Sequence, residues 1–274
     1  MNARMENSLE SNPKIYLGDR GFLKRYGSLH TLDETRHWFR KVAQDSCLGL
    51  ASGDWRTAME INRTLDRNSG RHLYHSRFLT NAHEKLSGRL LGVSELQRNA
   101  RLYGCSREFR FSPDWRQINE DIEIIKRFRP RRVSIGGDWL DMLLEQGQNA
   151  LIEEILQCLQ SSVDDVEIEW LMLTFKPSRQ ALSLLDRFRF DGVLAPVNLL
   201  QPDCNENRVC LDEIRRHSAL YALHCLAGGV IPVMPAIDYA LNHMGASACV
   251  VGAGKSKHIM ELMRCEALYR RACP

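Results

Sequence analysis

Short apolar runs alternate with longer stretches of helical periodicity along almost the whole chain. The strand-like runs span 14–18, 47–52, 72–78, 131–137, 166–175, 190–200, 229–235 and 247–253. Between them, apolar residues recur every three or four positions, which is the spacing of one helix face. Residues 1–13 are polar and follow neither pattern, so we expect a flexible segment there.

The helix-like segments span 31–46, 55–68, 83–104, 112–128, 140–162, 177–188, 211–228, 236–245 and 256–272. Two of them begin with a recognisable start signal. Thr31 with Glu34 three residues later is a capping box. Ser112 before Pro113 predicts a serine cap with proline in the first helical turn. These signals support the helical interpretation of the two segments.

The alternation of strands and helices predicts parallel strands joined by right-handed helical crossovers. Eight such units within residues 14–274 favour one domain, a closed (β/α)8 TIM barrel. An open, doubly wound sheet is the alternative architecture, since both folds are built from the same repeating unit.

Composition and charge exclude several classes of function. The chain is 44% hydrophobic and 26% charged, and its net charge of +3 comes from scattered basic residues, so no nucleic-acid surface is indicated. The first residues lack the apolar core of a signal peptide, and no apolar run approaches the length that spans a membrane. We therefore expect a cytoplasmic protein that binds neither nucleic acid nor membrane. The oligomeric state stays open.

The chain has nine cysteines and no C-x-x-C pair, which is typical of reduced thiols in a cytosolic protein. A zinc site is the alternative. Five zinc-binding residue types lie close in sequence, namely Cys204, Cys210, His217, His224 and Cys225. Their spacing matches no standard zinc site, so we predict no metal.

The segment ACVVGAGKSKHIMEL (248–262) passes from an apolar run through two glycines into a helical pattern. In a (β/α)8 barrel the last loops often bind phosphate, because backbone N–H groups at a helix start point at the anion. Four residues have this chemistry: Gly252, Gly254, Lys255 and Ser256. A Walker loop is excluded because it needs glycine where Cys249 stands. The alternative is a glycine-rich turn with a solvent-exposed lysine.

Several segments together resemble the aldo-keto reductases. The stretch AIDYALNHMGASACVVGAGKSKHIMEL (236–262) looks like the carboxyl end of that family. Similar likenesses occur in 17–27, 111–139 and 191–200. The resemblance implies a (β/α)8 barrel that reduces carbonyl compounds with NADPH. It also implies that the start of the last helix, at Gly252, Gly254, Lys255 and Ser256, binds the adenosine phosphate of NADP.

The catalytic residues of that family do not align with this chain. Aldo-keto reductases use an aspartate, a tyrosine, a lysine and a histidine, the tyrosine supplying the proton. Alignment on Glu60 places Ala51 at the aspartate and Arg56 at the tyrosine. The lysine falls on Ser76-Arg77 and the histidine on Gly136-Gly137. Without a phenol of lowered pKa, carbonyl reduction by this route is not expected.

Other polar residues follow the predicted strands and would meet at the barrel mouth. They are Asp19, Arg20, Asp54, Arg56, Arg77, Asp138, Trp139, Lys176 and Asn198. Arginines bind planar anions through paired hydrogen bonds. We therefore take Asp54, Arg56, Arg77 and Asp138 as candidate catalytic residues of a mouth that accepts a small anionic metabolite. The alternative is that these charges are solvated or pair with one another.

Two further groups could perform acid–base work in place of the tyrosine. Asp54 lies a few residues from the family position. His75 precedes Arg77 on the third strand, although alternation sends successive side chains to opposite faces.

Three functions fit these observations. The first is an enzyme of altered chemistry acting on a small anionic metabolite, by isomerisation, elimination, hydrolysis or a different redox step. The second is an NADP-dependent oxidoreductase with a relocated proton donor, for which Tyr26 and Tyr74 are the spare phenols. The third is a binding or scaffold protein without catalysis. The cofactor is accordingly NADP or none.

Overall fold

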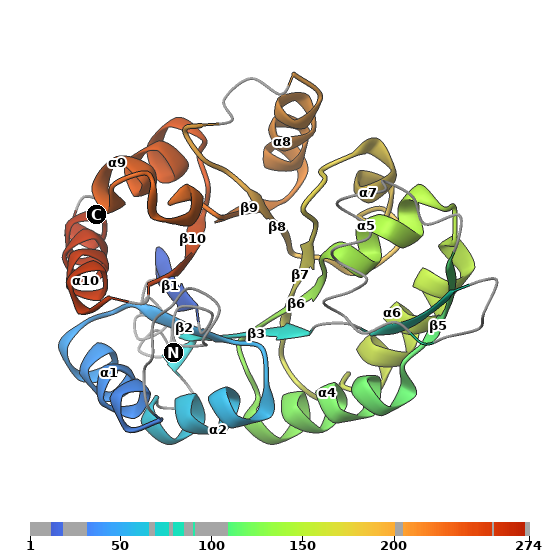
Figure 1. Cartoon of the computed structure of the whole chain (residues 1–274), viewed down its shortest axis with the longest axis horizontal. Coiled ribbons are helices and arrows are strands. Elements are labelled where there is room, and N and C mark those ends of the chain that lie inside the picture. Colours follow the sequence, from blue (N-terminus) through green and yellow to red (C-terminus); the bar gives the residue numbers. More distant parts are fainter. Residues whose placement is uncertain are drawn as a thin grey trace, which may run out of the picture.

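Eight parallel strands close into a barrel in the computed structural model of this chain (Figure 1). The structure describes residues 12–18, 32–65, 69–76, 79–84, 90, 109–200, 205–253 and 255–271. In barrel order the strands are β1 (Ile15–Gly18), β10 (Ala248–Gly252), β9 (Ala219–Leu223), β8 (Gly192–Pro196), β7 (Glu169–Leu173), β6 (Arg132–Gly136), β3 (His72–Ser76) and β2 (Gly49–Ser52). Since β1 pairs with both β2 and β10, the ring is closed and the open-sheet alternative is wrong.

The helices surround the barrel, as Figure 1 shows. They are α1 (Leu32–Asp45), α2 (Trp55–Thr64), α4 (Trp115–Phe128), α5 (Asp138–Glu145), α6 (Asn149–Ser161), α7 (Arg179–Ser183), α8 (Asn205–His217), α9 (Val233–Asp238) and α10 (Ser256–Arg271). Two short helical turns, η6 (Ala227–Gly229) and η7 (Tyr239–His243), flank α9. On α4, for example, Ile118, Ile122 and Ile125 are buried. These apolar stripes cover the outer face of the strands.

One of the eight predicted strands is wrong, and another takes its place. Residues 229–235 hold no strand, because Pro232 ends the preceding loop as the cap of α9 and α9 begins at Val233. Proline is tolerated at helix starts but cannot donate a hydrogen bond within a sheet. The strand of this unit is β9, Ala219–Leu223, inside the predicted helix 211–228. Helix α8 ends earlier, at His217.

A hairpin outside the barrel interrupts the third unit. Strands β4 (Thr80–Glu84) and β5 (Phe109–Pro113) pair antiparallel as a separate two-stranded sheet. The helix predicted for 83–104 therefore starts inside a strand, and most of that segment lies outside the described residues. Ala82 and Phe109 pack against Met142 of α5, so the hairpin is attached to the helical layer.

One of the two predicted helix starts, at Ser112, is wrong. Helix α4 begins after Asp114, which accepts a hydrogen bond from the Gln117 N–H at 3.1 Å. Ser112 and Pro113 belong to β5 and do not cap this helix. Thr31, the other predicted cap, lies outside the described residues.

Strand β3 shows how the two faces of the barrel wall differ. Leu73 points inward, where it shares an apolar cluster with Leu171 and Leu194. Tyr74 and Ser76 point outward and donate hydrogen bonds to Asp121 of α4, at 2.7 and 2.5 Å. Burial raises the pKa of Asp121 to about 6, although these hydrogen bonds oppose the shift. Asp121 thus ties α4 to the outer face of β3.

A buried arginine closes the amino-terminal end of the barrel, which we call the floor. The Arg132 side chain is 1% exposed and donates to the hydroxyls of Tyr16 and Tyr221. It also forms an ion pair of 2.7 Å with Glu169. A charge taken out of water is tolerated when it is paired and hydrogen-bonded in this way. Gly49 leaves room for the Tyr16 ring, which a Cβ at that position would meet at 2.3 Å.

We predict that His72 makes the fold sensitive to acid. Its Nε2 lies 2.9 Å from Ser52 Oγ, and burial lowers its pKa from 6.5 to about 3. The stability contributed by the neutral ring is complete above pH 6.5 and is lost as the pH falls toward 3. His72→Gln should therefore lose less free energy of unfolding on acidification than the parent, by up to about 1.4 kcal/mol per pH unit.

Urea unfolding at pH 7.5, 6, 5 and 4 measures this difference. His217→Gln is the matched control, because His217 is exposed on α8. If His72→Gln and the parent lose stability in parallel, His72 is not the source of the acid sensitivity.

Candidate functional site

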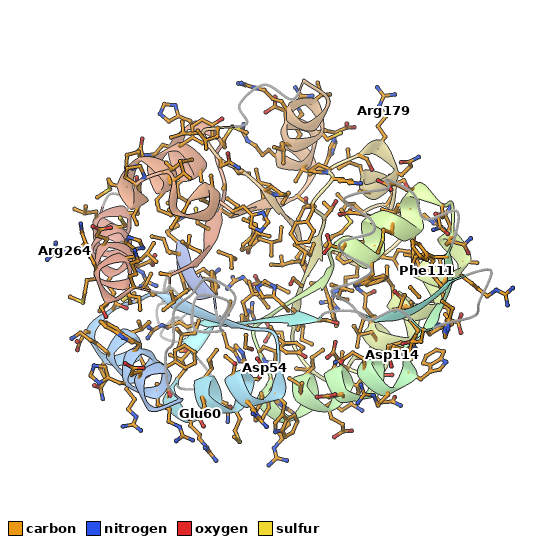
Figure 2. The ribbon with its side chains drawn as sticks, viewed as in Figure 1. Asp54, Glu60, Phe111, Asp114, Arg179 and Arg264 are labelled. Carbon is orange, nitrogen blue, oxygen red and sulfur yellow. The ribbon has the colours of Figure 1, made fainter. Side chains whose placement is uncertain are left out.

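The carboxyl ends of the eight strands share one mouth, where (β/α)8 barrels carry their chemistry. Two of the predicted catalytic residues lie there at helix starts. Asp54, labelled in Figure 2, caps α2. It accepts hydrogen bonds from the Thr57 N–H at 3.0 Å and the Thr57 hydroxyl at 2.9 Å. Asp138 is the first residue of α5, and it is not without an interaction partner. Both carboxylates thus begin a helix directly behind a strand end.

The two predicted arginines are placed differently. Arg56 lies in the first turn of α2 with an exposed side chain. Arg77 lies outside the described residues. Because β3 stands between β2 and β6 in the ring, Asp54 and Asp138 flank the end of the strand that Arg77 follows in sequence.

The predicted phosphate-binding residues adjoin one strand end and one helix start. Gly252 ends β10 with its backbone exposed, and α10 begins at Ser256. Lys255 and Ser256 are exposed, whereas Gly254 lies outside the described residues. In other proteins phosphate binds at the start of a helix that follows a strand end within a few residues.

Sequence reasoning named His75 as an acid–base candidate but missed the partner that the structure gives it, Ser134. His75 of β3 and Ser134 of β6 are directly opposite in register, and Nδ1 and Oγ share a hydrogen bond of 2.5 Å. His75 follows Leu73 by two residues, so both side chains point inward. It is 7% exposed, and Ser134 is fully buried. His75 and Arg77 are also two residues apart, so alternation does not separate them, contrary to our expectation.

Glycine occupies the next inward-facing position of β6. Gly136 has φ +127°, and a Cβ there would lie 2.1 Å from the carbonyl oxygen of Leu173. Gly137 follows with φ +98°. No L-residue adopts this pair of conformations without strain, so the wall above Ser134 consists of bare backbone.

An aromatic pair stands at the ends of β7 and β9. The rings of Phe175 and His224 are stacked, with centroids 5.4 Å apart and planes 3° from parallel. His224 has φ +58°, a left-handed conformation that is uncommon for a residue other than glycine. Backbone strain of this kind concentrates at functional sites.

A buried carboxylate fixes the segment that carries Phe175. Asp141 of α5 accepts hydrogen bonds from the Thr174 hydroxyl at 2.6 Å and from the Phe175 N–H at 2.8 Å. Burial raises the pKa of Asp141 to about 6, against the effect of these hydrogen bonds. The end of β7 is therefore fastened to α5 in the way that Asp121 fastens β3 to α4.

Metal ligands do not converge among the described residues: they hold no group of three histidine, cysteine or acidic side chains able to bind a metal ion. Cys204, one member of the zinc alternative, lies outside them. The described cysteines are free thiols, at 47, 158, 210, 225, 249 and 265. Within the same ranges, none of the helices has the length and apolar character needed to cross a membrane.

Comparison with solved structures identifies the architecture. A Pseudomonas aeruginosa protein assigned by name to the aldo-keto reductases aligns with a TM-score of 0.58 at 14% identity, over 93% of this chain and 89% of that one. An aldo-keto reductase from Bacillus halodurans in its holo form aligns with a TM-score of 0.59 at 11% identity, over 92% and 85% of the two chains. No protein-family model and no curated protein matches the sequence.

This chain has the aldo-keto reductase fold. On that fold, the four positions aligned with the family's catalytic residues fall on or beside β2, β3 and β6. Ala51 is buried inside the barrel, Arg56 is exposed on α2, and Gly136 is confined by the Leu173 backbone. On β6, Ser134 lies two residues before Gly136, which is one inward-facing position closer to the floor, and His75 stands opposite Ser134 on β3.

The tyrosines described on this aldo-keto reductase fold lie away from its mouth. Tyr74 points outward to Asp121, and Tyr16 and Tyr221 bind Arg132 at the floor. Burial raises the pKa of Tyr16, which makes its phenol a weaker proton donor. Tyr239 and Tyr269 lie in η7 and α10, and Tyr269 donates a hydrogen bond to Asp238. Tyr26 is outside the described residues.

We predict that Gly136→Ala is strongly destabilising. The added Cβ would collide with the Leu173 carbonyl, and the backbone conformation would remain strained, so a loss above about 3 kcal/mol of unfolding free energy is expected. Gly147→Ala is the control, because Gly147 also has a positive φ, +65°, but has nothing within 4 Å of the new Cβ. It should cost about 1–2 kcal/mol. Equal losses in urea unfolding would contradict the proposed crowding at Gly136.

Proposed function

We propose that this protein is a small-molecule enzyme that acts on an anionic metabolite and uses His75, oriented by Ser134, for proton transfer. The observation that carries the proposal is the 2.5 Å contact between His75 Nδ1 and Ser134 Oγ on the inner face of the barrel. Imidazole is the side chain whose ordinary pKa allows it to give and take protons near neutral pH. A hydrogen bond at Nδ1 holds the ring in one orientation, which general acid–base catalysis requires.

The residues aligned with the family's catalytic groups support a change of chemistry. Alanine and glycine carry no proton donor, and arginine hardly releases a proton, so Ala51, Gly136 and Arg56 cannot supply the acid of a carbonyl reductase. His75 stands opposite Ser134, which is one inward-facing position closer to the floor than Gly136. The acid–base function has therefore moved toward the floor, from a phenol to an imidazole.

Charges around the end of β3 support an anionic substrate. Arg77 follows His75 by two residues in sequence, and Arg56 follows the neighbouring strand β2. A guanidinium beside the imidazole would hold a carboxylate or phosphate through paired hydrogen bonds. Asp54 and Asp138 would position these arginines or assist proton transfer. The reaction that fits best is isomerisation or elimination at a carbon next to the anionic group, in the cytoplasm and without contact with nucleic acid or membrane.

A second candidate is an NADP-dependent oxidoreductase with His75 as the relocated proton donor. The short passage from Gly252 to α10 and the exposed Lys255 and Ser256 favour it. These residues, with Gly254, would bind the adenosine phosphate, and NADPH would supply hydride. The alternative is that no cofactor is bound. A binding or scaffold protein that retains the fold without catalysis is the third candidate.

We predict that His75→Asn strongly slows turnover. The protein would be incubated in D2O with a panel of 2-oxo acids, 2-hydroxy acids and sugar phosphates, and proton NMR would follow exchange or loss of the hydrogen next to the anionic group. His75→Asn should be slower by at least about 100-fold, the usual contribution of a general acid–base group. Ser134→Ala should retain part of the activity, because it loses the orientation of the ring and not the ring itself.

The control is His243→Asn, because the His243 side chain is 69% exposed on the outside of the barrel, beside Asp238. It should behave as the parent does. Full activity in His75→Asn would refute the assignment of His75, and no activity on any compound of the panel would favour the binding or scaffold protein.

Titration with NADPH, followed by tryptophan fluorescence, separates the first two candidates. Saturable binding that Lys255→Ala weakens about tenfold, together with aldehyde reduction that His75→Asn abolishes, would support the oxidoreductase. Lys257→Ala is the control, since Lys257 is an exposed lysine of the same helix paired with Glu261. Absence of NADPH binding would exclude the oxidoreductase and leave proton-transfer chemistry.

A further inference from the structure

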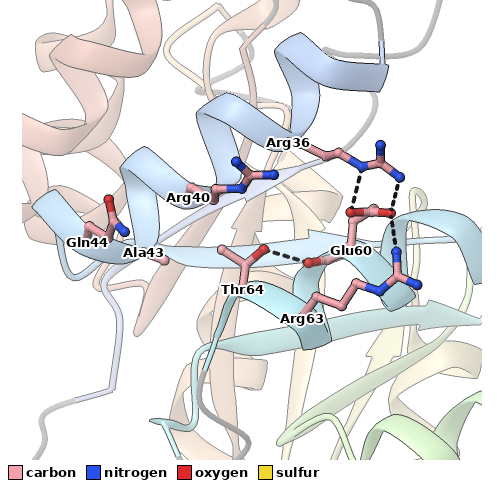
Figure 3. A pocket seen from close by; sticks show the side chains of 7 residues that line it. All are labelled: Arg36, Arg40, Ala43, Gln44, Glu60, Arg63 and Thr64. Carbon is pink, nitrogen blue, oxygen red and sulfur yellow. Dashed lines mark hydrogen bonds and ion pairs between the residues drawn. The ribbon is translucent and has the colours of Figure 1, made fainter.

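A cleft of about 450 Å³ separates α1 from α2 on the outside of the barrel. Its lining is almost wholly polar, and Figure 3 shows the side chains that form it. Helix α1 contributes Arg36, Arg40, Ala43 and Gln44, and helix α2 contributes Glu60, Arg63 and Thr64. The volume lies in the range of small-molecule binding sites.

The cleft is built around one buried carboxylate. Glu60 is 6% exposed and accepts two hydrogen bonds of 2.9 Å from Arg36, through Nε and Nη2. It accepts a third, of 3.0 Å, from Arg63 Nη1. The bond from Arg36 lowers the pKa of Glu60, so this carboxylate is charged at neutral pH. Glu60 thus holds two guanidinium groups, one from each helix, in fixed positions (Figure 3).

Positive charge remains after this pairing. The lining residues comprise three guanidinium groups and one carboxylate, a net charge of +2. Arg40 is exposed and has no carboxylate partner among the described residues, and it lies between Arg36 and Gln44 along α1 (Figure 3). Like charges four residues apart on a helix, such as Arg36 and Arg40, destabilise it. An anion bound between them would offset this repulsion.

We propose that this cleft binds the phosphate group of a small, hydrophilic metabolite. A phosphate monoester carries close to two negative charges at neutral pH and so matches the net charge of the cleft. Guanidinium forks fit its tetrahedral oxygens, and the amide of Gln44 offers another donor. Ala43 is the single apolar lining residue, and the lining has no aromatic ring on which a nucleobase could stack. A sugar phosphate fits this lining better than a nucleotide does.

The cleft is independent of the proposed active site. Gln44 and Thr64 lie at the carboxyl ends of α1 and α2, and helices of this barrel run opposite to its strands. The cleft therefore opens toward the floor, away from His75. Ligand bound there would bridge α1 and α2 and would be retained in a variant that lacks His75.

Isothermal titration with glucose 6-phosphate, inorganic phosphate and glucose tests the proposal. Glucose 6-phosphate should bind, and glucose should not. Arg40→Ala should weaken binding about tenfold and Arg63→Ala by a similar factor. Lys41→Ala is the matched control, because Lys41 is the next residue of α1 and its ammonium group pairs with Asp45 at 2.7 Å. It should bind as the parent does.

The outcomes separate the sources of the phosphate and expose a wrong assignment. Equal affinity for glucose 6-phosphate and inorganic phosphate would support the site and identify free phosphate as its ligand. The proposal would be overturned if neither glucose 6-phosphate nor inorganic phosphate bound when added in 10-fold excess over about 1 mM protein. Equal weakening by Arg40→Ala and Lys41→Ala would also overturn it, because general surface charge would then explain the binding. His75→Asn should bind unchanged, so failure of the proposed catalysis would leave this site testable.

Discussion

Closure of the parallel sheet is the constraint on which the rest of this molecule depends. A ring of eight strands has an inside of fixed width, and alternate residues of every strand must fill it. Near the floor the filling includes Tyr16, which lies against the bare backbone of Gly49, and the buried guanidinium of Arg132. The charge of Arg132 is paired with Glu169, and two phenols accept its hydrogen bonds. Packed and paired side chains thereby close the floor.

The outer face of the same strands carries a second set of polar contacts. Asp121 and Asp141 reach from α4 and α5 to the ends of β3 and β7, and burial raises the pKa of each to about 6. Both carboxylates hold segments that bear candidate functional groups, since His75 lies between two residues bonded to Asp121 and Phe175 itself bonds to Asp141. Rigid strand ends of this kind keep inward-facing side chains in place, which a catalytic site requires.

Two environments of opposite character result from this architecture. Inside the barrel, His75 and Ser134 are nearly removed from water, where one hydrogen bond strongly affects the orientation and protonation of a ring. Between α1 and α2, arginines face solvent, where paired charges contribute little to stability and where we propose that an anion binds. The aldo-keto reductase fold, shared with proteins at 11–14% identity, supplies the barrel and leaves both of these sites to the chain's own residues.

The amino-acid sequence by itself determined the alternation of strands and helices, and hence the barrel. A strand buried on both faces reads as a short continuous apolar run, whereas a helix buried on one face has apolar residues every three or four positions. It also located the passage from Gly252 into α10. It did not locate β9, since Ala219–Leu223 is a short apolar run that equally continues the helical pattern before it.

The tertiary structure alone decided the His75–Ser134 contact, because the two residues are 59 positions apart and meet through the register of β3 and β6 across an intervening hairpin. It likewise decided the arginine cleft, which exists because α1 and α2 pack side by side with Glu60 between them. Contacts of this kind depend on how separate elements pack against each other, and the local periodicity of the sequence does not determine that packing.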